Sequence, residues 1–295
     1  MDFQMAIDLA DEFRPQLLTL LFEFLMEFTP VYIGTTHSPR GDKIKNDGTP
    51  VGNLDVLAGK KLKAIIQRRF PGDVVLAEED KRDPQEIGRI LADQTSRIWT
   101  VDGLDGTGNR SMRLLSYGAA VALRQGGQIL FAFIFRPADE ILRGDGMFWA
   151  GAGMGAWMRC REHGEDHQLR TAKMGELERM TVLLEGSSKK FFHEPIVTLG
   201  RAITTRASVS SSVAATTVAL AKASAVVTVE NAPWDNWPMW LMIQEAGGVA
   251  TDWRGNPLTP ENCGNMVAAA NPEDHAMILR ILKQGLTTKL LAEGS

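Results

Sequence analysis

The sequence has little of what marks secreted, membrane-bound or nucleic-acid-binding proteins. Only two of its 295 residues are cysteines, Cys160 and Cys263. Two are too few for a disulfide scaffold, so we expect free thiols in a reducing, cytoplasmic compartment. Basic residues are not in excess, since the net charge is −4, and this argues against a nucleic-acid partner bound through a basic face. An anionic ligand would need positive charge from another source, such as a bound metal.

A membrane-spanning segment is also missing. Residues 17–33 are rich in Leu and Phe, but Glu23 and Glu27 interrupt the run and Pro30 ends it. A membrane span should not carry carboxylates at mid-depth. The apolar residues of this region recur at three- and four-residue spacing, which predicts an amphipathic helix lying on a core. We therefore expect no membrane partner.

Short apolar strands alternate with helices along the chain. The strand predicted at 73–77 stops at an acidic run, and Gly126-Gly127 joins two apolar runs in a plausible hairpin. The pattern predicts an α/β (α+β layered) protein with alternating helix and sheet layers. A polar stretch suggests two lobes, 1–160 with most of the chemical motifs and 161–295 with the remainder.

The most informative segment is WTVDGLDGT at 99–107. Asp102 and Asp105 leave the end of a predicted buried strand, and the Leu104 carbonyl lies between them. A hard cation such as Mg²⁺ takes carboxylate, carbonyl, water and phosphate oxygens. Gly106 and Thr107 could then open a turn or helix whose N–H groups face a phosphate. The alternative is an ordinary polar turn, in which Asp-Gly pairs are common.

Two further acidic motifs have their own alternatives. Glu78 begins an acidic triplet after the strand at 73–77, and such triplets are usually solvated loops. Asp235 precedes a helix predicted at 237–246 that ends in Glu-Ala-Gly-Gly, and there it could simply cap the helix.

In this order the motifs resemble those of the inositol monophosphatase family. Glu-Glu after a strand, Asp-x-x-Asp-Gly-Thr, and Trp-Asp before the helix carry the resemblance, which spans about 45–248. The stretch KNDGTPVGNLD at 45–55 is similar to the family's K-x-D-x-S-P-V-T-x-A-D. The resemblance implies an enzyme that uses Mg²⁺ and metal-activated water to hydrolyse a phosphate monoester of a small metabolite. A sugar or polyol phosphate is expected, and inositol monophosphate is the best single guess.

The resemblance also implies a metal site built from this chain's acids. One Mg²⁺ would be held by Glu78, Asp102 and the Leu104 carbonyl. A second would be held by Asp102, Asp105 and Asp235, with Asp102 bridging the two ions.

Other residues would handle the water and the substrate. Glu78 and Thr107 would orient the attacking water, with Asp55 hydrogen-bonded to Thr107. Phosphate or substrate contacts are expected at the following positions: Gly106, Thr107, Asn109 and Glu230. Lys45 and Asp47 would lie in a loop that closes over the site and helps hold a third ion. Lithium sensitivity and a homodimer are implied as well.

Departures from the family pattern leave the substrate open. Gly103 stands where the family usually has proline, which predicts a looser loop, and SSSV at 210–213 replaces Gly-Ser-Ala-Ala. Arg206 could reach the substrate or pair with a surface acid. The alternatives are a phosphatase for 3′-phosphoadenosine 5′-phosphate or histidinol phosphate with the same metals, and a degenerate, non-catalytic binding or regulatory member.

Overall fold

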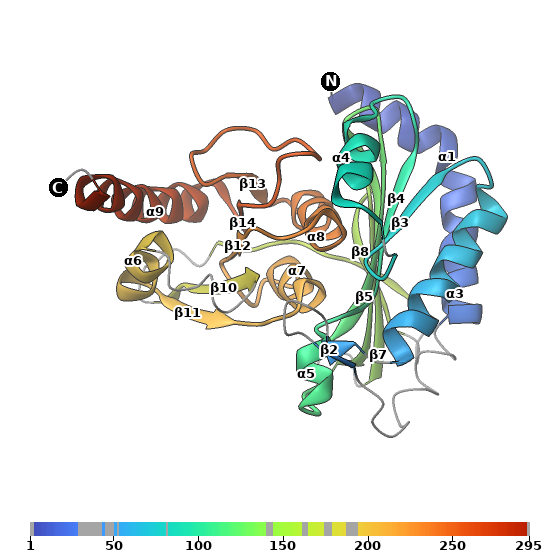
Figure 1. Cartoon of the computed structure of the whole chain (residues 1–295), viewed down its shortest axis with the longest axis horizontal. Coiled ribbons are helices and arrows are strands. Elements are labelled where there is room, and N and C mark those ends of the chain that lie inside the picture. Colours follow the sequence, from blue (N-terminus) through green and yellow to red (C-terminus); the bar gives the residue numbers. More distant parts are fainter. Residues whose placement is uncertain are drawn as a thin grey trace.

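The computed structural model describes residues 3–28, 43–44, 50–51, 53–80, 82–139, 144–160, 165–173, 179–186 and 194–293. Lys45 and Asp47 lie outside these ranges. Helices and sheets alternate in five layers: α1 with α3, a seven-stranded sheet, α7 with α8, a five-stranded sheet, and α6 with α9 (Figure 1). The alternating layers expected from the sequence are thus confirmed.

The larger sheet has the order β3-β4-β5-β6-β7-β8-β9. Its strands are β3 (Val74–Ala77), β4 (Ile98–Asp105), β5 (Gly118–Gln125), β6 (Gln128–Asp139), β7 (Gly144–Gly151), β8 (Gly155–Cys160) and β9 (Asp166–Gln168). Only β3 and β4 pair in parallel, and α4 (Pro84–Ala92) connects them. Gly126 and Gly127 adopt φ values of 56° and 75° between β5 and β6, the conformation that a two-residue hairpin turn requires. The sheet continues to β9, beyond residue 160.

The smaller sheet has the order β11-β10-β12-β14-β13. Its strands are β10 (Thr181–Gly186), β11 (Thr204–Ala207), β12 (Ala225–Val229), β13 (Val249–Asp252) and β14 (Met266–Ala269). The strands β10, β11 and β12 are parallel to one another, while β14 runs antiparallel to β12 and β13. Helices α6 (Glu194–Ala202) and α9 (Pro272–Glu293) cover its outer face.

The predicted N-terminal amphipathic helix is present as α1 (Phe3–Glu23), followed by one π-helical turn, η1 (Phe24–Phe28). With α3 (Asn53–Arg69) it covers the outer face of the larger sheet. Phe24 is fully buried and packs on Phe133 of β6, with ring centroids 4.8 Å apart. Within the described residues, no helix has both the length and the apolar character needed to cross a membrane. A short pair of strands, β1 (Lys43–Ile44) and β2 (Pro50–Val51), precedes α3.

The middle helices α7 (Ser211–Ala219) and α8 (Pro233–Glu245) lie between the two sheets, so most of their residues are buried. The predicted start of α8 at Trp237 is wrong. The helix begins four residues earlier, because Pro233 has a fixed φ suited to the first helical position. Asp235 therefore lies within the first turn of α8 rather than ahead of the helix.

Candidate active site

Three carboxylates converge where the larger sheet meets the middle helices. Asp102 and Asp105 come from the end of β4, and Asp235 comes from the first turn of α8. Each offers an oxygen, and these oxygens lie within 4.8 Å of one another. Asp102 and Asp105 are buried and Asp235 is half-buried. The structure thus brings together three acids that are up to 133 positions apart in the sequence.

A bulge in β4 allows the Asp102 and Asp105 carboxylates to lie on the same face of the sheet. Residues three apart in a regular strand point to opposite faces of the sheet. Here Asp102 pairs with Ala120 and Asp105 with Gly118, so three steps along β4 face two along β5. The additional residue of β4 forms a β-bulge, which changes the face of the sheet toward which the following side chain points.

The electrostatics of the cluster suit a divalent cation. Burial raises the pKa of Asp102 well above its usual range, and the Glu78 and Asp105 carboxylates raise it further. Burial also raises the pKa of Asp235, again with help from the neighbouring acids. Among the described residues, no Lys or Arg forms an ion pair with any of the three aspartates. Clustered carboxylates without a basic partner are the donor set that a hard cation prefers.

Asp105 is held by the start of α7. Its Oδ2 accepts hydrogen bonds from Ser210 Oγ at 2.8 Å and from the Ser212 amide at 2.5 Å, while Oδ1 accepts from the Ser211 amide at 3.0 Å. The positive end of the helix dipole favours a carboxylate at this position. The departure of 210–213 from the family pattern gave no indication of this contact. The one local signal was a serine preceding an apolar helix, which is typical of an N-cap.

Thr107 lies between two of the predicted partners. Its hydroxyl donates to the Leu104 carbonyl at 2.9 Å and lies 3.4 Å from Asp55 Oδ2. Asp55 is buried in the first turn of α3, and Asp102 Oδ1 accepts the Leu104 amide at 2.9 Å. Hydrogen bonds therefore connect the end of β4, the Thr107 hydroxyl and the Asp55 carboxylate of α3.

Gly103 does not loosen this loop, and that prediction is wrong. A Cβ at Gly103 would lie 2.4 Å from the Gly59 amide nitrogen and 2.7 Å from the Asp55 carbonyl oxygen. Both are backbone atoms of α3, which cannot give way as a flexible side chain could. The glycine thus allows β4 and α3 to pack in direct backbone contact.

Glu78 and Asp80, two acids of the triplet that follows β3, have different surroundings. Asp80 forms an ion pair with Lys63 at 2.8 Å, which is the solvated-loop behaviour of the alternative interpretation. Glu78 is half-buried and is close enough to Asp102 and Asp235 to raise their pKa values. Its backbone amide bonds the Val101 carbonyl, which fixes it beside the end of β4.

The predicted substrate contacts take different positions. Gly106 has φ 83° and begins α5 (Thr107–Ser111), the short helix foreseen after Asp105. Asn109 is buried, and its amide nitrogen donates to the carbonyls of Ser116, Ser208 and Val209. The side chains of Glu230, directly after β12, and Arg206, on the edge strand β11, are exposed.

Glu185 is an acid that the sequence analysis did not single out. It is buried at the end of β10 and accepts hydrogen bonds from the Ser208 hydroxyl and, at 3.3 Å, from the Ser210 amide. Burial raises the pKa of Glu185 to about 8, and the nearby Asp105 carboxylate adds to the shift. No sequence motif marks it, because its neighbours are apolar strand residues.

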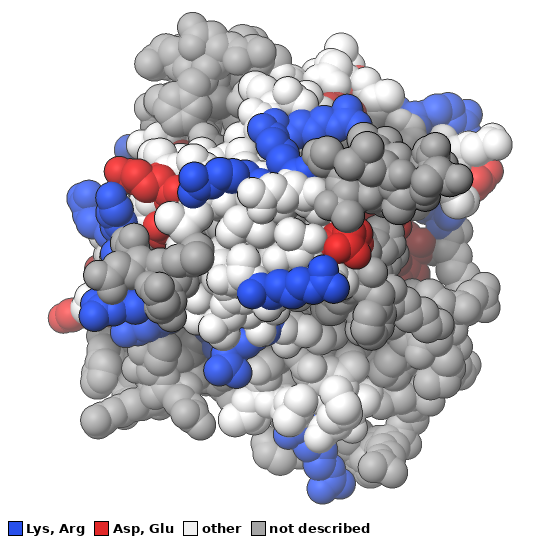
Figure 2. Space-filling model, turned by 90° about the vertical axis from the view of Figure 1, so that its left-hand side faces the viewer, with Lys and Arg blue, Asp and Glu red and all other residues white. Residues whose placement is uncertain are grey.

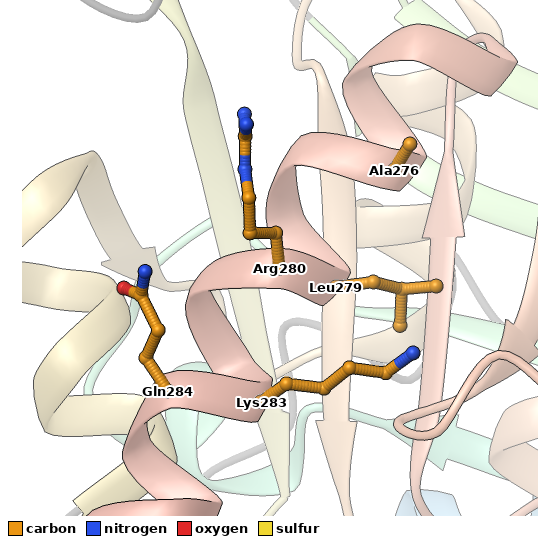
Figure 3. Close-up of a pocket in the computed structure, with 5 residues that line it drawn as sticks. All are labelled: Ala276, Leu279, Arg280, Lys283 and Gln284. Carbon is orange, nitrogen blue, oxygen red and sulfur yellow. The ribbon is translucent and has the colours of Figure 1, made fainter.

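A separate hollow of about 430 Å³ lies along α9, lined by Ala276, Leu279, Arg280, Lys283 and Gln284 (Figure 3). Figure 2 shows one face of the molecule, on which Lys and Arg side chains are spread among uncharged residues. The hollow contains none of the residues of the carboxylate cluster, and its lining has no acid that could bind a cation.

Comparisons with known proteins agree with this geometry. The sequence model of the inositol monophosphatase family matches residues 29–287. Among curated relatives, a glucose-1-phosphate thymidylyltransferase from Streptomyces griseus is 29% identical, covering 72% of this chain and 76% of its own length. An inositol-1-monophosphatase from Bacillus subtilis is 24% identical, covering 79% of this chain and 83% of its own length.

Solved structures show the same fold. The extragenic suppressor protein suhB from Bartonella henselae aligns with a TM-score of 0.75 and 20% identity. The alignment covers 91% of this chain and 98% of that protein.

Proposed function

The chain belongs to the inositol monophosphatase family, and from this premise we propose that it hydrolyses the phosphate monoester of a small sugar or polyol in a Mg²⁺-dependent reaction. Inositol monophosphate is the leading substrate. The observation that carries the proposal is the convergence of Asp102, Asp105 and Asp235, which have no basic partner within the part of the chain that the structure describes. Family membership supports phosphatase chemistry, and the carboxylate cluster supports its dependence on a metal.

The metal would be held by acids whose side chains lie close together in the structure. Asp102, Asp105 and Asp235 would be the shared ligands, with Glu78 and the Leu104 carbonyl completing the set for two or three ions. A carboxylate has about four lone-pair sites, and three hydrogen bonds already engage Asp105, so Oδ1 has capacity for one further partner. Bound Mg²⁺ would supply positive charge to the phosphate oxygens and lower the pKa of a coordinated water.

Thr107 would position the attacking water rather than act as a nucleophile. Its hydroxyl proton is directed to the Leu104 carbonyl at 2.9 Å, which leaves the oxygen lone pairs free to accept a hydrogen bond. Asp55 Oδ2 lies 3.4 Å from this hydroxyl, and Glu78 follows β3 beside the end of β4, so both acids would help to orient the same water and accept its proton. No covalent intermediate on the protein is required.

The leaving alcohol would lie towards the smaller sheet. Glu230, at the end of β12, is the proposed contact for a substrate hydroxyl, and the first turn of α5 after Gly106 is the proposed phosphate contact. Asn109 would support that turn and could reach the substrate only through a change in its present hydrogen bonds. We further propose a homodimer in the cytoplasm and inhibition by millimolar Li⁺.

The test is phosphate release from a panel of esters with Mg²⁺ and with excess chelator. The panel includes inositol 1-phosphate, a hexose phosphate, 3′-phosphoadenosine 5′-phosphate and histidinol phosphate. We expect turnover that requires Mg²⁺, is highest with a polyol ester and falls in millimolar Li⁺. A control reaction with dTTP and glucose 1-phosphate tests the activity in the name of the Streptomyces relative. Pyrophosphate release there, with none of the esters hydrolysed, would contradict the proposal.

The second candidate is a non-catalytic binding protein. The altered segment at 210–213 favours it, since SSSV stands there in place of the family's Gly-Ser-Ala-Ala. The cluster of repelling carboxylates argues against it, because a protein without a metal gains nothing from keeping buried acids together. Absence of turnover on every ester, with Mg²⁺ still bound, would favour this candidate.

A further inference from the structure

The segment connecting β11 to α7 is strained. Val209 has φ +52°, a conformation that β-branched residues rarely adopt. Its side chain is 41% exposed, so packing of the valine does not hold the segment in place. A strained backbone persists only where surrounding groups over-determine it, and such strain is concentrated at functional sites.

Two buried polar side chains, Asn109 and Glu185, are hydrogen-bonded to this segment. Asn109 of α5 donates to the Ser208 carbonyl at 2.8 Å and to the Val209 carbonyl at 3.3 Å. Glu185 of β10 accepts from the Ser208 hydroxyl and from the Ser210 amide at 3.3 Å. Both side-chain hydrogen bonds of Glu185 go to residues 208–210, so its carboxyl group is linked to this segment rather than to its own strand.

The segment in turn fixes Asp105. Ser210 ends the strained stretch, and its hydroxyl donates to Asp105 Oδ2 at 2.8 Å. The next two amides, of Ser211 and Ser212, complete the set of donors to the same carboxylate. A shift of Ser210 would therefore move three donors at once and release Asp105 to rotate.

We propose that Glu185, together with Asn109, is a positioning residue that holds residues 208–210 and thereby fixes the orientation of Asp105 for metal binding. The proposal rests on the proposed function in so far as Asp105 is a metal ligand. Glu185 is not itself part of the ligand set, and within the described residues the converging carboxylates are Asp102, Asp105 and Asp235. Outer partners that orient metal ligands typically change metal affinity or activity by about 10–100-fold when they are removed.

The burial of Glu185 supports this role. An ionisable group is rarely fully buried unless its polar atoms are bonded, because an unpaired buried carboxyl costs several kcal/mol. Glu185 is 3% exposed, and its carboxyl group accepts hydrogen bonds from Ser208 and Ser210 of one segment. A leucine of similar size would fill the same space, so the acid is explained by its contacts with that segment and not by packing.

Four variants separate positioning from general stability. Glu185→Leu removes the acceptor and keeps the volume, while Glu185→Gln keeps an acceptor oxygen at the same length. Glu245→Leu is the matched control, because Glu245 is a half-buried acid that accepts the amides of Gly153 and Gly155 at 3.0 and 2.9 Å, away from this segment. Ser208→Ala, at a half-buried position, is a milder change if Glu185→Leu fails to fold.

The first measurement is amide hydrogen exchange at Ser211 and Ser212 in the metal-free protein. We expect about tenfold faster exchange in Glu185→Leu, a smaller change in the same direction in Ser208→Ala, and wild-type exchange in Glu185→Gln and Glu245→Leu. Calorimetric titration with Mg²⁺ is the second, with a dissociation constant about tenfold weaker in Glu185→Leu only. Unchanged exchange at both amides in Glu185→Leu or Ser208→Ala would overturn the proposal.

The two measurements separate this inference from the proposed function. Faster exchange in a protein whose wild type neither binds Mg²⁺ nor releases phosphate would uphold the link from Glu185 to the α7 amides and refute the metal-dependent reaction. Normal turnover in the wild type with no exchange change in the variants would do the reverse.

Discussion

Gly103 of β4 lies directly against the backbone of Gly59 in α3, so closely that a Cβ on Gly103 would come within 2.4 Å of the Gly59 amide nitrogen. This contact sets how near α3 approaches the end of the strand. Asp55, one turn earlier in α3, is thereby placed 3.4 Å from the Thr107 hydroxyl. Gly103, which replaces the family's proline, is therefore the residue that allows α3 to pack against the site.

Gly103→Ala should therefore destabilise the protein and lower turnover. The methyl group would meet backbone atoms, and overpacking of this kind costs about 1–3 kcal/mol. The measurement is the free energy of unfolding by denaturant, with kcat on the preferred ester. Gly59→Ala is the control, since a Cβ there meets no atom within 4 Å. It should be neutral or stabilising by up to about 1 kcal/mol, because alanine is the better helix former. Equal losses in both variants would contradict the contact.

Asp235→Asn should raise the thermal stability of the metal-free protein and lower it when Mg²⁺ is present. Removing one negative charge relieves repulsion with Asp102 and Asp105, an effect on the order of 1 kcal/mol. A ligand at 100 times its dissociation constant stabilises the wild type by about 2.7 kcal/mol, and the variant should lose most of that. Thermal unfolding with chelator and with Mg²⁺ measures both.

Asp80→Asn is the control for this reversal. Asp80 lies two residues from Glu78 but is paired with Lys63 at 2.8 Å. Its loss should change stability in the same direction under both conditions. A stabilising effect of Mg²⁺ that is identical in wild type and Asp235→Asn would remove Asp235 from the metal site.

His275 should make the protein less stable as the pH falls below about 6.5. Burial lowers the pKa of His275, so at mildly acidic pH the unfolded chain binds a proton that the folded chain does not. Stability then falls with falling pH, by at most about 1.4 kcal/mol per pH unit for one proton. Unfolding free energies from pH 7.5 to 5.5 should show a shallower decline in His275→Gln. His167→Gln, which removes an exposed histidine, is the control for the substitution itself.

Thr107→Val should lower kcat with little effect on KM or stability. The substitution keeps the shape but removes the oxygen that lies between the Leu104 carbonyl and Asp55. Loss of a group that orients the attacking water for proton transfer to the neighbouring acids is expected to reduce the rate by about 10²–10⁴-fold. Thr107→Ser keeps the hydroxyl and should retain most activity. A valine variant with wild-type kcat would show that another group positions the water.

Much of the site could be predicted from the sequence because its acids lie at strand ends or in the first turn of a helix. Asp102 and Asp105 sit in one short motif, and Glu78 follows the neighbouring strand β3. The alternation of apolar strands and helices predicted the layers of the fold, and the resemblance of the motifs to the family implied the meeting of Asp235 with the β4 acids. Apolar patterns also predicted the strand at 73–77, the hairpin at Gly126-Gly127 and the N-terminal amphipathic helix.

What the sequence did not reveal depends on contacts across long stretches of chain. The bulge that aligns Asp102 with Asp105 is set by pairing with β5, which local patterns do not encode. The serines at the start of α7 reach Asp105 over more than 100 positions. Glu185 was missed because a single acid in an apolar strand has no local signature, and its meaning appears only when Ser208 and Ser210 are placed beside it.

The most direct test of the central claim is Mg²⁺-dependent phosphate release by the wild type and by Asp102→Asn, each verified as folded. Asp102 is buried, and one of its carboxylate oxygens lies within 4.8 Å of an oxygen of Asp105 and of Asp235. It belongs to both proposed metal positions. We predict turnover that requires Mg²⁺ in the wild type and a loss of at least about 10²-fold in the variant, with Asp166→Asn, an exposed aspartate paired with Arg159, unaffected. Turnover by Asp102→Asn equal to that of the wild type at the same Mg²⁺ concentration would contradict the account.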